Sequence, residues 1–342
     1  MNETQLFTVM TTIQPPTMAV RLLQDKLDAC GASLLIVGDS KGPAEFNIPT
    51  QLGTFYSVKQ QNDLPYALGK LLPFNHYARK NLGYLEAMRY GASCIYETDD
   101  DNAPNDLWQP RAETIEVSHA VAQGEWLNAY QLFSESKIWP RGFPLDQVLN
   151  TGKTAIADNA AAKAVLAPIQ QGLADNSPDV DAVWRFVLDE PFTFNRAPSV
   201  AIPTSQWCPF NSQSTWWWPR VYPLMYLPSY CSFRVTDIWR SFIAQRCLWE
   251  IDAHLVFHAP EVIQHRNEHD LMKDFVDELP GYLRNNELIS ILSGLSLTTG
   301  EDHMALNLLN CYRALIDAAF FPHEEGELVA AWIADCHSIT QP

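Results

Sequence analysis

The 342-residue sequence predicts an α/β fold built around a doubly wound, parallel sheet. Two observations predict it. Short apolar, β-rich runs alternate with helix-patterned segments over the first hundred residues. In addition, 47% of all residues are hydrophobic, which is enough for a large buried core. Strands that alternate with helices generally pair in parallel, with helices covering the sheet.

Each expected element rests on a local pattern. The strands are apolar runs that end at polar or turn residues: Leu6–Ile13, Ser33–Val37, Phe55–Val58 and Cys94–Tyr96. Apolar residues at helical spacing predict helices over Thr17–Ala29 and Tyr77–Tyr90. Later in the chain, strands are expected at Asn128–Phe133 and Ala182–Val187, and helices at Asp237–Leu248, Leu271–Asp277, Asn286–Ser293 and His303–Phe320.

Composition excludes several classes of protein. A formal charge of −17 repels phosphodiester backbones, so we expect no nucleic-acid partner. No window of about 18 apolar residues lacks a charge or a proline, so no membrane span is expected. The start has no secretory signal pattern, and the seven cysteines are scattered without a CxxC spacing. These features predict a cytoplasmic protein with reduced thiols.

An acidic run follows the predicted strand Cys94–Tyr96 and carries Glu97, Asp99, Asp100 and Asp101. Carboxyl ends of parallel strands share one edge of a sheet, so Gln14 and Asp39, which follow the first two strands, should lie near this run. Crowded carboxylates favour a hard cation, and Mg²⁺ or Mn²⁺ takes one or two of them plus phosphate oxygens. The alternative is a solvated acidic turn.

The helix before the acidic run begins with Arg79, Lys80 and Asn81. Cations at a helix N-terminus oppose the helix dipole unless an anion lies nearby. A diphosphate would supply that anion, and the first-turn N–H groups could also bind it. The three residues are therefore candidate donor contacts, and the alternative is an exposed basic pair.

Several segments resemble the STELLO-type family of glycosyltransferases. They are Pro73–Ala87, Gly91-Ala92, Ile95–Asn102, Val37–Pro43, Trp139–Leu145, Asp179–Arg185 and Ser232–Arg240. The resemblance implies a GT-A fold, Rossmann-like with a mostly parallel central sheet, a nucleotide-sugar donor and a role in glycan or polysaccharide synthesis. On this basis we expect a GT-A domain over residues 1–267, with a donor half of about 1–135 and an acceptor half of about 136–267. A helical C-terminal appendage is expected over 268–342.

The GT-A resemblance also implies roles for single residues. Gln14, Asp39, Arg79, Lys80, Asn81, Glu97 and Asp99 are the candidate donor contacts. Asp99 and Asp101, a DxD pair, and the late histidine His258 are the candidate metal ligands. The candidate acceptor contacts are Trp139, Arg141, Asp179, Asp181, Asn211, Gln213, Trp217 and Arg240. Aromatic faces pack on sugars and amides bind hydroxyls, although tryptophans more often lie in a core.

Asp237 is the candidate catalytic base. It begins a predicted helix whose layout is similar to that of cellulose-synthase-like inverting enzymes, in which an acid at a helix start precedes a Gln-x-x-Arg-Trp sequence. Gln245 and Trp249 keep this spacing, whereas Leu248 replaces the arginine. A helix-capping role for Asp237 is the alternative, and it is compatible with proton acceptance.

Together these features predict an enzyme: a metal-dependent glycosyltransferase that moves a sugar from a nucleotide-diphosphate sugar to a glycan acceptor, with inversion if Asp237 is the base. A nucleotidyltransferase is one alternative, but its usual Gly-rich basic loop is absent from Gln14-Pro-Pro-Thr17. A non-catalytic scaffold for glycan-synthesis proteins is the other. The sequence leaves hexosyl and pentosyl transfer, and the oligomeric state, open.

Overall fold

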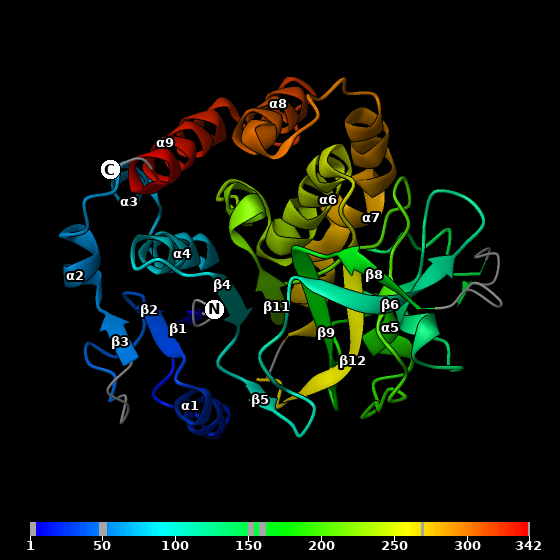
Figure 1. Ribbon diagram of the computed structural model, residues 1–342, viewed down its shortest axis with the longest axis horizontal. Coiled ribbons are helices and arrows are strands. Elements are labelled where there is room, and N and C mark those ends of the chain that lie inside the picture. The colour runs from blue at the N-terminus through cyan, green and yellow to red at the C-terminus, as the bar shows by residue number, and fades with distance from the viewer. Residues whose placement is uncertain (1–4, 48–52, 150–153, 157–161, 268–269, 341–342) are drawn as a thin grey trace.

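The computed structural model describes residues 5–47, 53–149, 154–156, 162–267 and 270–340. Its strands form one twelve-stranded sheet: β1 (Leu6–Thr12), β2 (Ser33–Gly38), β3 (Gly53–Tyr56), β4 (Cys94–Thr98), β5 (Asn102–Pro104), β6 (Thr114–Val121), β7 (Ala155–Ile156), β8 (Lys163–Leu166), β9 (Ile169–Asp175), β10 (Val200–Ala201), β11 (Ser214–Trp217) and β12 (Leu255–Gln264). The order is β3-β2-β1-β4-β11-β9-β12-β10-β6-β7, with β5 beside β12 and β8 beside β6 (Figure 1).

Most strands of the central sheet run in one direction. β3, β2, β1 and β4 are parallel neighbours. β11 is antiparallel to both β4 and β9, so β9 and its parallel neighbour β12 point the same way as β4. The predicted α/β fold with a mostly parallel central sheet is therefore confirmed, and the arrangement is consistent with a GT-A-like fold.

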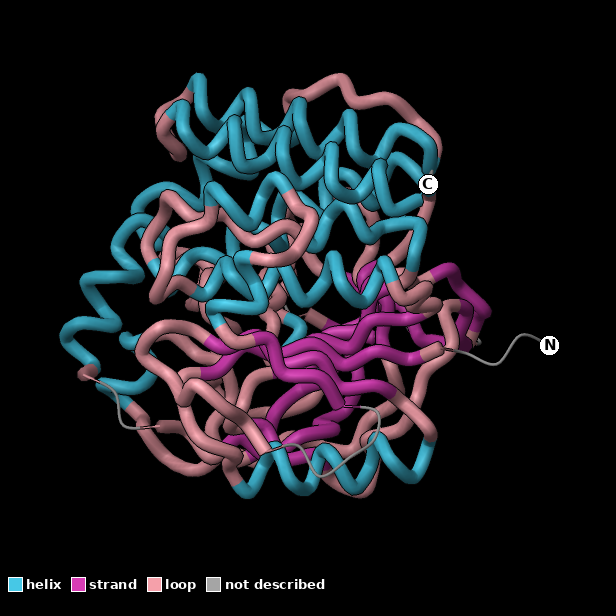
Figure 2. The backbone as a smooth tube through the Cα atoms, turned by 90° about the vertical axis from the view of Figure 1, so that its left-hand side faces the viewer, coloured by secondary structure: helices cyan, strands magenta, loops and turns pink. Residues whose placement is uncertain are grey.

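Helices cover both faces of the sheet (Figure 2). The helices are α1 (Met18–Cys30), α2 (Val58–Asn62), α3 (Ala67–Leu71), α4 (Lys80–Arg89), α5 (Ala182–Val187), α6 (Thr236–Leu248), α7 (Leu271–Ser293), α8 (Met304–Asp317) and α9 (His323–Thr340). β1 alternates between the two faces: Leu6 and Met10 pack with α1, whereas Phe7 and Val9 pack with α4. Gly83 lets α4 lie close to β1, because a Cβ there would stand 2.5 Å from Val9 Cγ1.

Two predicted strands are wrong. Ala182–Val187 is the helix α5, and Asn128–Phe133 contains a short 3₁₀ helix, η2 (Ala129–Leu132). In both cases the preceding side chain caps the turn: Asp181 accepts from Trp184 N, and Asn128 accepts from Tyr130 N. A capped turn satisfies backbone donors that a strand would need a neighbour to satisfy, so it overrides the β-rich composition of these short runs.

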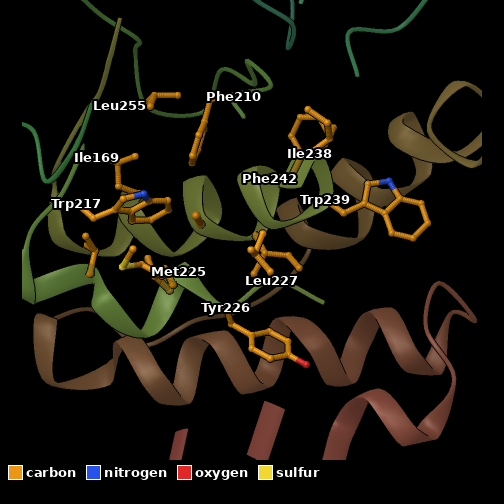
Figure 3. Close-up of a cluster of buried hydrophobic side chains, with 14 of the residues drawn as sticks. Ile169, Phe210, Trp217, Met225, Tyr226, Leu227, Ile238, Trp239, Phe242 and Leu255 are labelled. Atoms are coloured by element: carbon orange, nitrogen blue, oxygen red, sulfur yellow. The ribbon is translucent and has the colours of Figure 1, made fainter. Parts of the chain in front are cut away.

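The C-terminal helices share the core of the sheet. α7 is one continuous helix through Pro280, where the sequence predicted two, and α9 was not predicted. Leu288, Leu308 and Trp332 of α7, α8 and α9 lie in the same cluster as Ile169 and Leu255 of the sheet. Figure 3 shows the part of this cluster around α6. The boundary at residues 267 and 268 stays a prediction, and residue 268 lies outside the described residues.

No helix among the described residues combines the length and apolar character needed to cross a bilayer.

Candidate functional site

A cavity of about 530 Å³ lies at the carboxyl ends of β2, β1 and β4. Gln14 follows β1, Asp39 follows β2 and Asp99 follows β4, and all three line the cavity. The expected convergence of these strand ends is therefore confirmed. Asp39 is fixed there by accepting hydrogen bonds from Ser40 N at 2.7 Å and His76 N at 2.9 Å.

The side chain of Asp99 is held rigidly at the cavity wall. Its Oδ1 accepts hydrogen bonds from Tyr77 Oη at 2.7 Å and from Lys80 Nζ at 2.9 Å. Lys80 is fully buried and also donates to Thr98 O, so its ammonium group contacts Asp99 from the protein interior. About 30% of the Asp99 side chain stays exposed, which leaves room for a ligand.

Asp100 and Asp101 also line the cavity, and their environment disfavours negative charge. Burial, with Asp99 as a neighbouring charge, raises the pKa of Asp100 even though Thr12 Oγ1 donates to it. The same two causes raise the pKa of Asp101 to about 7. Neighbouring carboxylates in this half-buried wall therefore disfavour one another's negative charge.

The predicted third metal ligand is wrong. His258 on β12 is buried, and both ring nitrogens are engaged: Nδ1 lies 2.6 Å from Ser199 Oγ and Nε2 lies 2.9 Å from Gln170 Oε1. It is not among the described residues that line the cavity. Within the described part of the chain, no group of three His, Cys, Asp or Glu residues is arranged to hold a metal. A cation held by Asp99 and Asp101 would need further oxygen ligands, which a bound substrate could supply.

Glu97 is not among the described residues that line the cavity. It is fully buried and forms a bidentate ion pair with Arg240 of α6, at 2.7 and 2.9 Å. Tyr84 Oη and Trp217 Nε1 donate to the same carboxylate. The predicted donor contact of Glu97 and the predicted acceptor contacts of Arg240 and Trp217 are therefore wrong, because these groups saturate one another in the core.

The basic pair at the start of α4 is also internal. Arg79 is fully buried, donates to Gln61 Oε1 and Leu72 O, and lies over the Phe74 ring. Asn81 exchanges two hydrogen bonds with the backbone of Leu227. With Lys80 bound to Asp99, none of the three is in the described lining of the cavity. Their predicted donor contacts are wrong, and Lys80 acts instead by positioning Asp99.

Asp237 does line the cavity, and it is ionised. Its two oxygens accept hydrogen bonds from Arg141 Nη1 and Nη2, both at 3.0 Å. Burial acts to raise its pKa, but Arg141 and the more remote Arg240 and Arg234 outweigh it, and the pKa of Asp237 is lowered. The alternative capping role is wrong: α6 begins at Thr236, and its N-cap residue is Val235.

Arg141 joins Asp237 to a second carboxylate. Its Nε and Nη2 donate to Asp179, both at 2.8 Å, so one guanidinium bridges two acids at the cavity wall. Asn211 and Gln213 also lie in the wall.

Trp139 and Asp181 are not among the described residues that line the cavity. The buried Trp139 Nε1 donates to Asp181 Oδ2 at 2.6 Å, so their predicted acceptor contacts are wrong.

Comparison with known proteins adds a family resemblance to this geometry. Residues 234–341 match the family model of the STELLO glycosyltransferases. The chain is 28% identical over 324 residues to "Probable glycosyltransferase STELLO2" of Arabidopsis thaliana, covering 89% of this chain and 41% of that protein. It is 26% identical over 352 residues to "Probable glycosyltransferase STELLO1" of the same plant, covering 97% of this chain and 44% of the relative.

The chain is therefore similar to the STELLO glycosyltransferases. The resemblance expected from the sequence motifs is thus confirmed, and both similar proteins are named as probable glycosyltransferases. The chain spans less than half the length of the two STELLO proteins.

Sequence reasoning missed several residues of this candidate site. Tyr77 and Ser212, whose hydroxyls lie 2.6 Å apart, join the Asp99 wall to the Asp237 wall. Gln264 donates to Asp101 at 2.9 Å from the end of β12. Because β12 runs in the same direction as β4, the rule of converging carboxyl ends would have found Gln264 if the full length of β12 had been predicted.

We expect Arg79→Met to destabilise the protein by about 1–3 kcal/mol, because Gln61 and Leu72 would lose a buried donor. Binding of a nucleoside diphosphate should stay within about twofold, since Arg79 is not among the described residues that line the cavity. Urea unfolding and calorimetric titration check the two parts. Arg21→Met, on the exposed side of α1, is the matched control. Weakened binding with unchanged stability would contradict the internal role.

A second expectation concerns pH. Burial raises the pKa of Asp181 from 3.8 to about 7, against hydrogen bonds from Trp184 N and Trp139. The folded state therefore keeps a proton that the unfolded state releases, and this residue lowers stability as pH rises from about 4 to 7. Asp181→Asn keeps one oxygen for the cap but loses the bond from Trp139, so its stability relative to the parent should rise between pH 5 and pH 8 by on the order of 1–3 kcal/mol. Urea unfolding at pH 5 and pH 8 measures this, and parallel pH profiles would refute it.

Proposed function

We propose that this protein is a metal-dependent glycosyltransferase that uses a nucleotide-diphosphate sugar. One observation carries the proposal: three carboxylates of the run after β4, one of them pinned by a buried lysine, face the same cavity as an ionised Asp237. A sugar transferase needs both parts, a cation to bind a leaving diphosphate and a group to accept a proton from the acceptor hydroxyl.

The donor occupies the end of the cavity formed by β2, β1 and β4 in this proposal. We assign Asp39 and Gln14, which line the cavity, to the nucleoside, and Asp99 and Asp101 of the same lining to the diphosphate. Mg²⁺ or Mn²⁺ would be held by Asp99, Asp101 and phosphate oxygens. When bound, the cation supplies charge stabilisation for the departing diphosphate.

The residues of the chain supply the remaining steps. Lys80 and Tyr77 keep Asp99 in place, and Gln264 orients Asp101. Asp237 accepts the proton of the acceptor hydroxyl at a carboxylate oxygen, while Arg141 and Ser212 orient it. Attack from this side, opposite the leaving diphosphate, inverts the configuration of the sugar. A glycan acceptor fits the Asn211 and Gln213 wall, whose amides can bind hydroxyls.

A panel of nucleotide-diphosphate sugars tests the proposal. We expect one donor class to release nucleoside diphosphate in the presence of Mn²⁺, and the release to increase with a matching sugar acceptor. The anomeric configuration of the transferred sugar, determined by NMR, distinguishes inversion from retention. Release of monophosphate and pyrophosphate from a nucleoside triphosphate would indicate a nucleotidyltransferase instead, and absence of any turnover with any donor would favour a scaffold.

A further inference from the structure

Four arginines line the cavity, and we call them the arginine cluster: Arg141, Arg185, Arg234 and Arg266. They come from separate parts of the chain, namely the loop before β7, α5, η4 (Phe233–Val235) and the segment after β12. The protein as a whole carries a formal charge of −17, so four cations in one cavity wall are a local feature and not a consequence of composition.

Three of these arginines form ion pairs with acidic residues outside the described lining of the cavity. Arg234 pairs with Glu278 at 2.8 Å, Arg266 with Asp274 at 2.7 Å, and Arg185 with the exposed Asp189 at 3.6 Å. None of these acids is in the described lining of the cavity. The lining acids Asp179 and Asp237 are both engaged by Arg141. The lining here therefore carries four guanidinium groups and two carboxylates.

Arg185 is the least satisfied member of the cluster. Only 6% of it is exposed, its Nη2 donates to Ser177 Oγ and Pro178 O, and its buried Nε has no hydrogen-bond partner in the described structure. Burial, and next the charge of Arg266, lower the pKa of Arg185 to about 10. A buried donor without a partner and a neighbouring like charge are both costly, and an anion between the guanidinium groups would relieve both.

We propose that the arginine cluster binds an anionic group of the acceptor, so that the acceptor is an acidic or phosphorylated glycan. The assignment of the ligand as an acceptor rests on the proposed function, whereas the presence of an anion site does not. A planar guanidinium binds carboxylate and phosphate oxygens in the same bidentate way, so a uronate and a sugar phosphate share the chemistry. The proposed function assigns the donor diphosphate to Asp99 and Asp101, whose carboxylates would need a cation to bind it.

Calorimetric titration with three matched hexoses tests this inference: glucose, glucuronate and glucose 6-phosphate, with inorganic phosphate as a fourth probe. Each is titrated into the protein with and without saturating nucleoside diphosphate and Mn²⁺. We expect at least one anionic hexose to bind about 10–100-fold more tightly than glucose, in line with one or two charge-assisted hydrogen bonds. The uronate and phosphate arms identify which anion the site prefers.

Variants assign the effect to the cluster. Arg185→Gln and Arg266→Gln should each remove most of the preference for the anion, whereas Arg266→Lys, which keeps the charge, should fall between. Nucleoside diphosphate affinity should stay within about twofold in all three. Arg313→Gln, exposed on α8, is the matched control.

Three results would overturn the inference: equal or no binding of all four probes, a preference that survives both Gln substitutions, or displacement of the anion by nucleoside diphosphate. Failure of nucleotide binding with a retained, arginine-dependent anion preference would instead refute the proposed function and leave the anion site standing.

Discussion

Asp237→Asn should lower the rate of sugar transfer by at least about 100-fold, because an amide cannot accept the proton that a carboxylate base removes. The structure makes this variant informative. Asp237 is not a helix cap, its ionised form is favoured by Arg141, and Ser212 also donates to it. An asparagine oxygen can keep one bond to Arg141, which retains Asp179 as its second partner. The fold and metal-dependent nucleotide binding should therefore survive.

Steady-state release of nucleoside diphosphate from the active donor, with acceptor, measures this effect. Asp302→Asn, an exposed substitution outside the cavity, is the matched control and should keep parental turnover. Near-normal turnover of the Asp237 variant would remove Asp237 from the mechanism and leave inversion without support. An increase in the Michaelis constant for the acceptor with an unchanged kcat would mean that Asp237 only binds acceptor.

Glu97→Gln should destabilise the protein by about 3–5 kcal/mol, because it leaves the guanidinium of Arg240 buried without its counter-ion. Both side chains are almost completely inaccessible, and the pair joins β4, which precedes Asp99, to α6, which carries Asp237. The free energy of unfolding in urea measures the loss. Glu287→Gln removes one partner of an exposed pair with Arg284 and should cost less than about 1 kcal/mol.

A second substitution separates the charge effect from packing. In Glu97→Gln/Arg240→Met the cation is gone, while the amide oxygen can still accept from Trp217 and the amide NH2 can donate to Tyr84 Oη. The double variant should therefore be more stable than Glu97→Gln alone. If the single substitution were as mild as Glu287→Gln, the pair would contribute little to holding β4 against α6.

The donor end of the site could be predicted because it depends on pattern and topology alone. β1, β2 and β4 are apolar runs with clear ends, and parallel strands bring Gln14, Asp39 and Asp99 to one edge. The acceptor end depends on β9 and β12, which the sequence pattern did not reveal. β9 carries three polar or small residues in Gln170-Gln171-Gly172, so it lacks an apolar run although it is fully buried.

Side-chain direction was the other source of error. Arg79, Glu97 and Arg240 have the residue types of a phosphate or sugar site, yet each finds a partner inside the core. Sequence gives the charge of a residue but not the counter-charge that folding places against it, here across 143 positions between Glu97 and Arg240. Trp217 was misread for the same reason, since its ring packs in the core seen in Figure 3.

Calorimetric titration of a nucleoside diphosphate panel tests the central claim most directly. The experiment compares Mn²⁺ with EDTA, for the parent protein and for Asp99→Asn/Asp101→Asn, which keeps oxygen acceptors for Lys80 and Gln264 while removing both charges. Carboxylates and phosphates repel without a cation, so we expect binding of at least one diphosphate with Mn²⁺, none in EDTA, and loss of the Mn²⁺-dependent binding in the double variant. Equal affinity in Mn²⁺ and EDTA, or undiminished Mn²⁺-dependent binding by the double variant, would contradict a metal-dependent donor site at the end of β4.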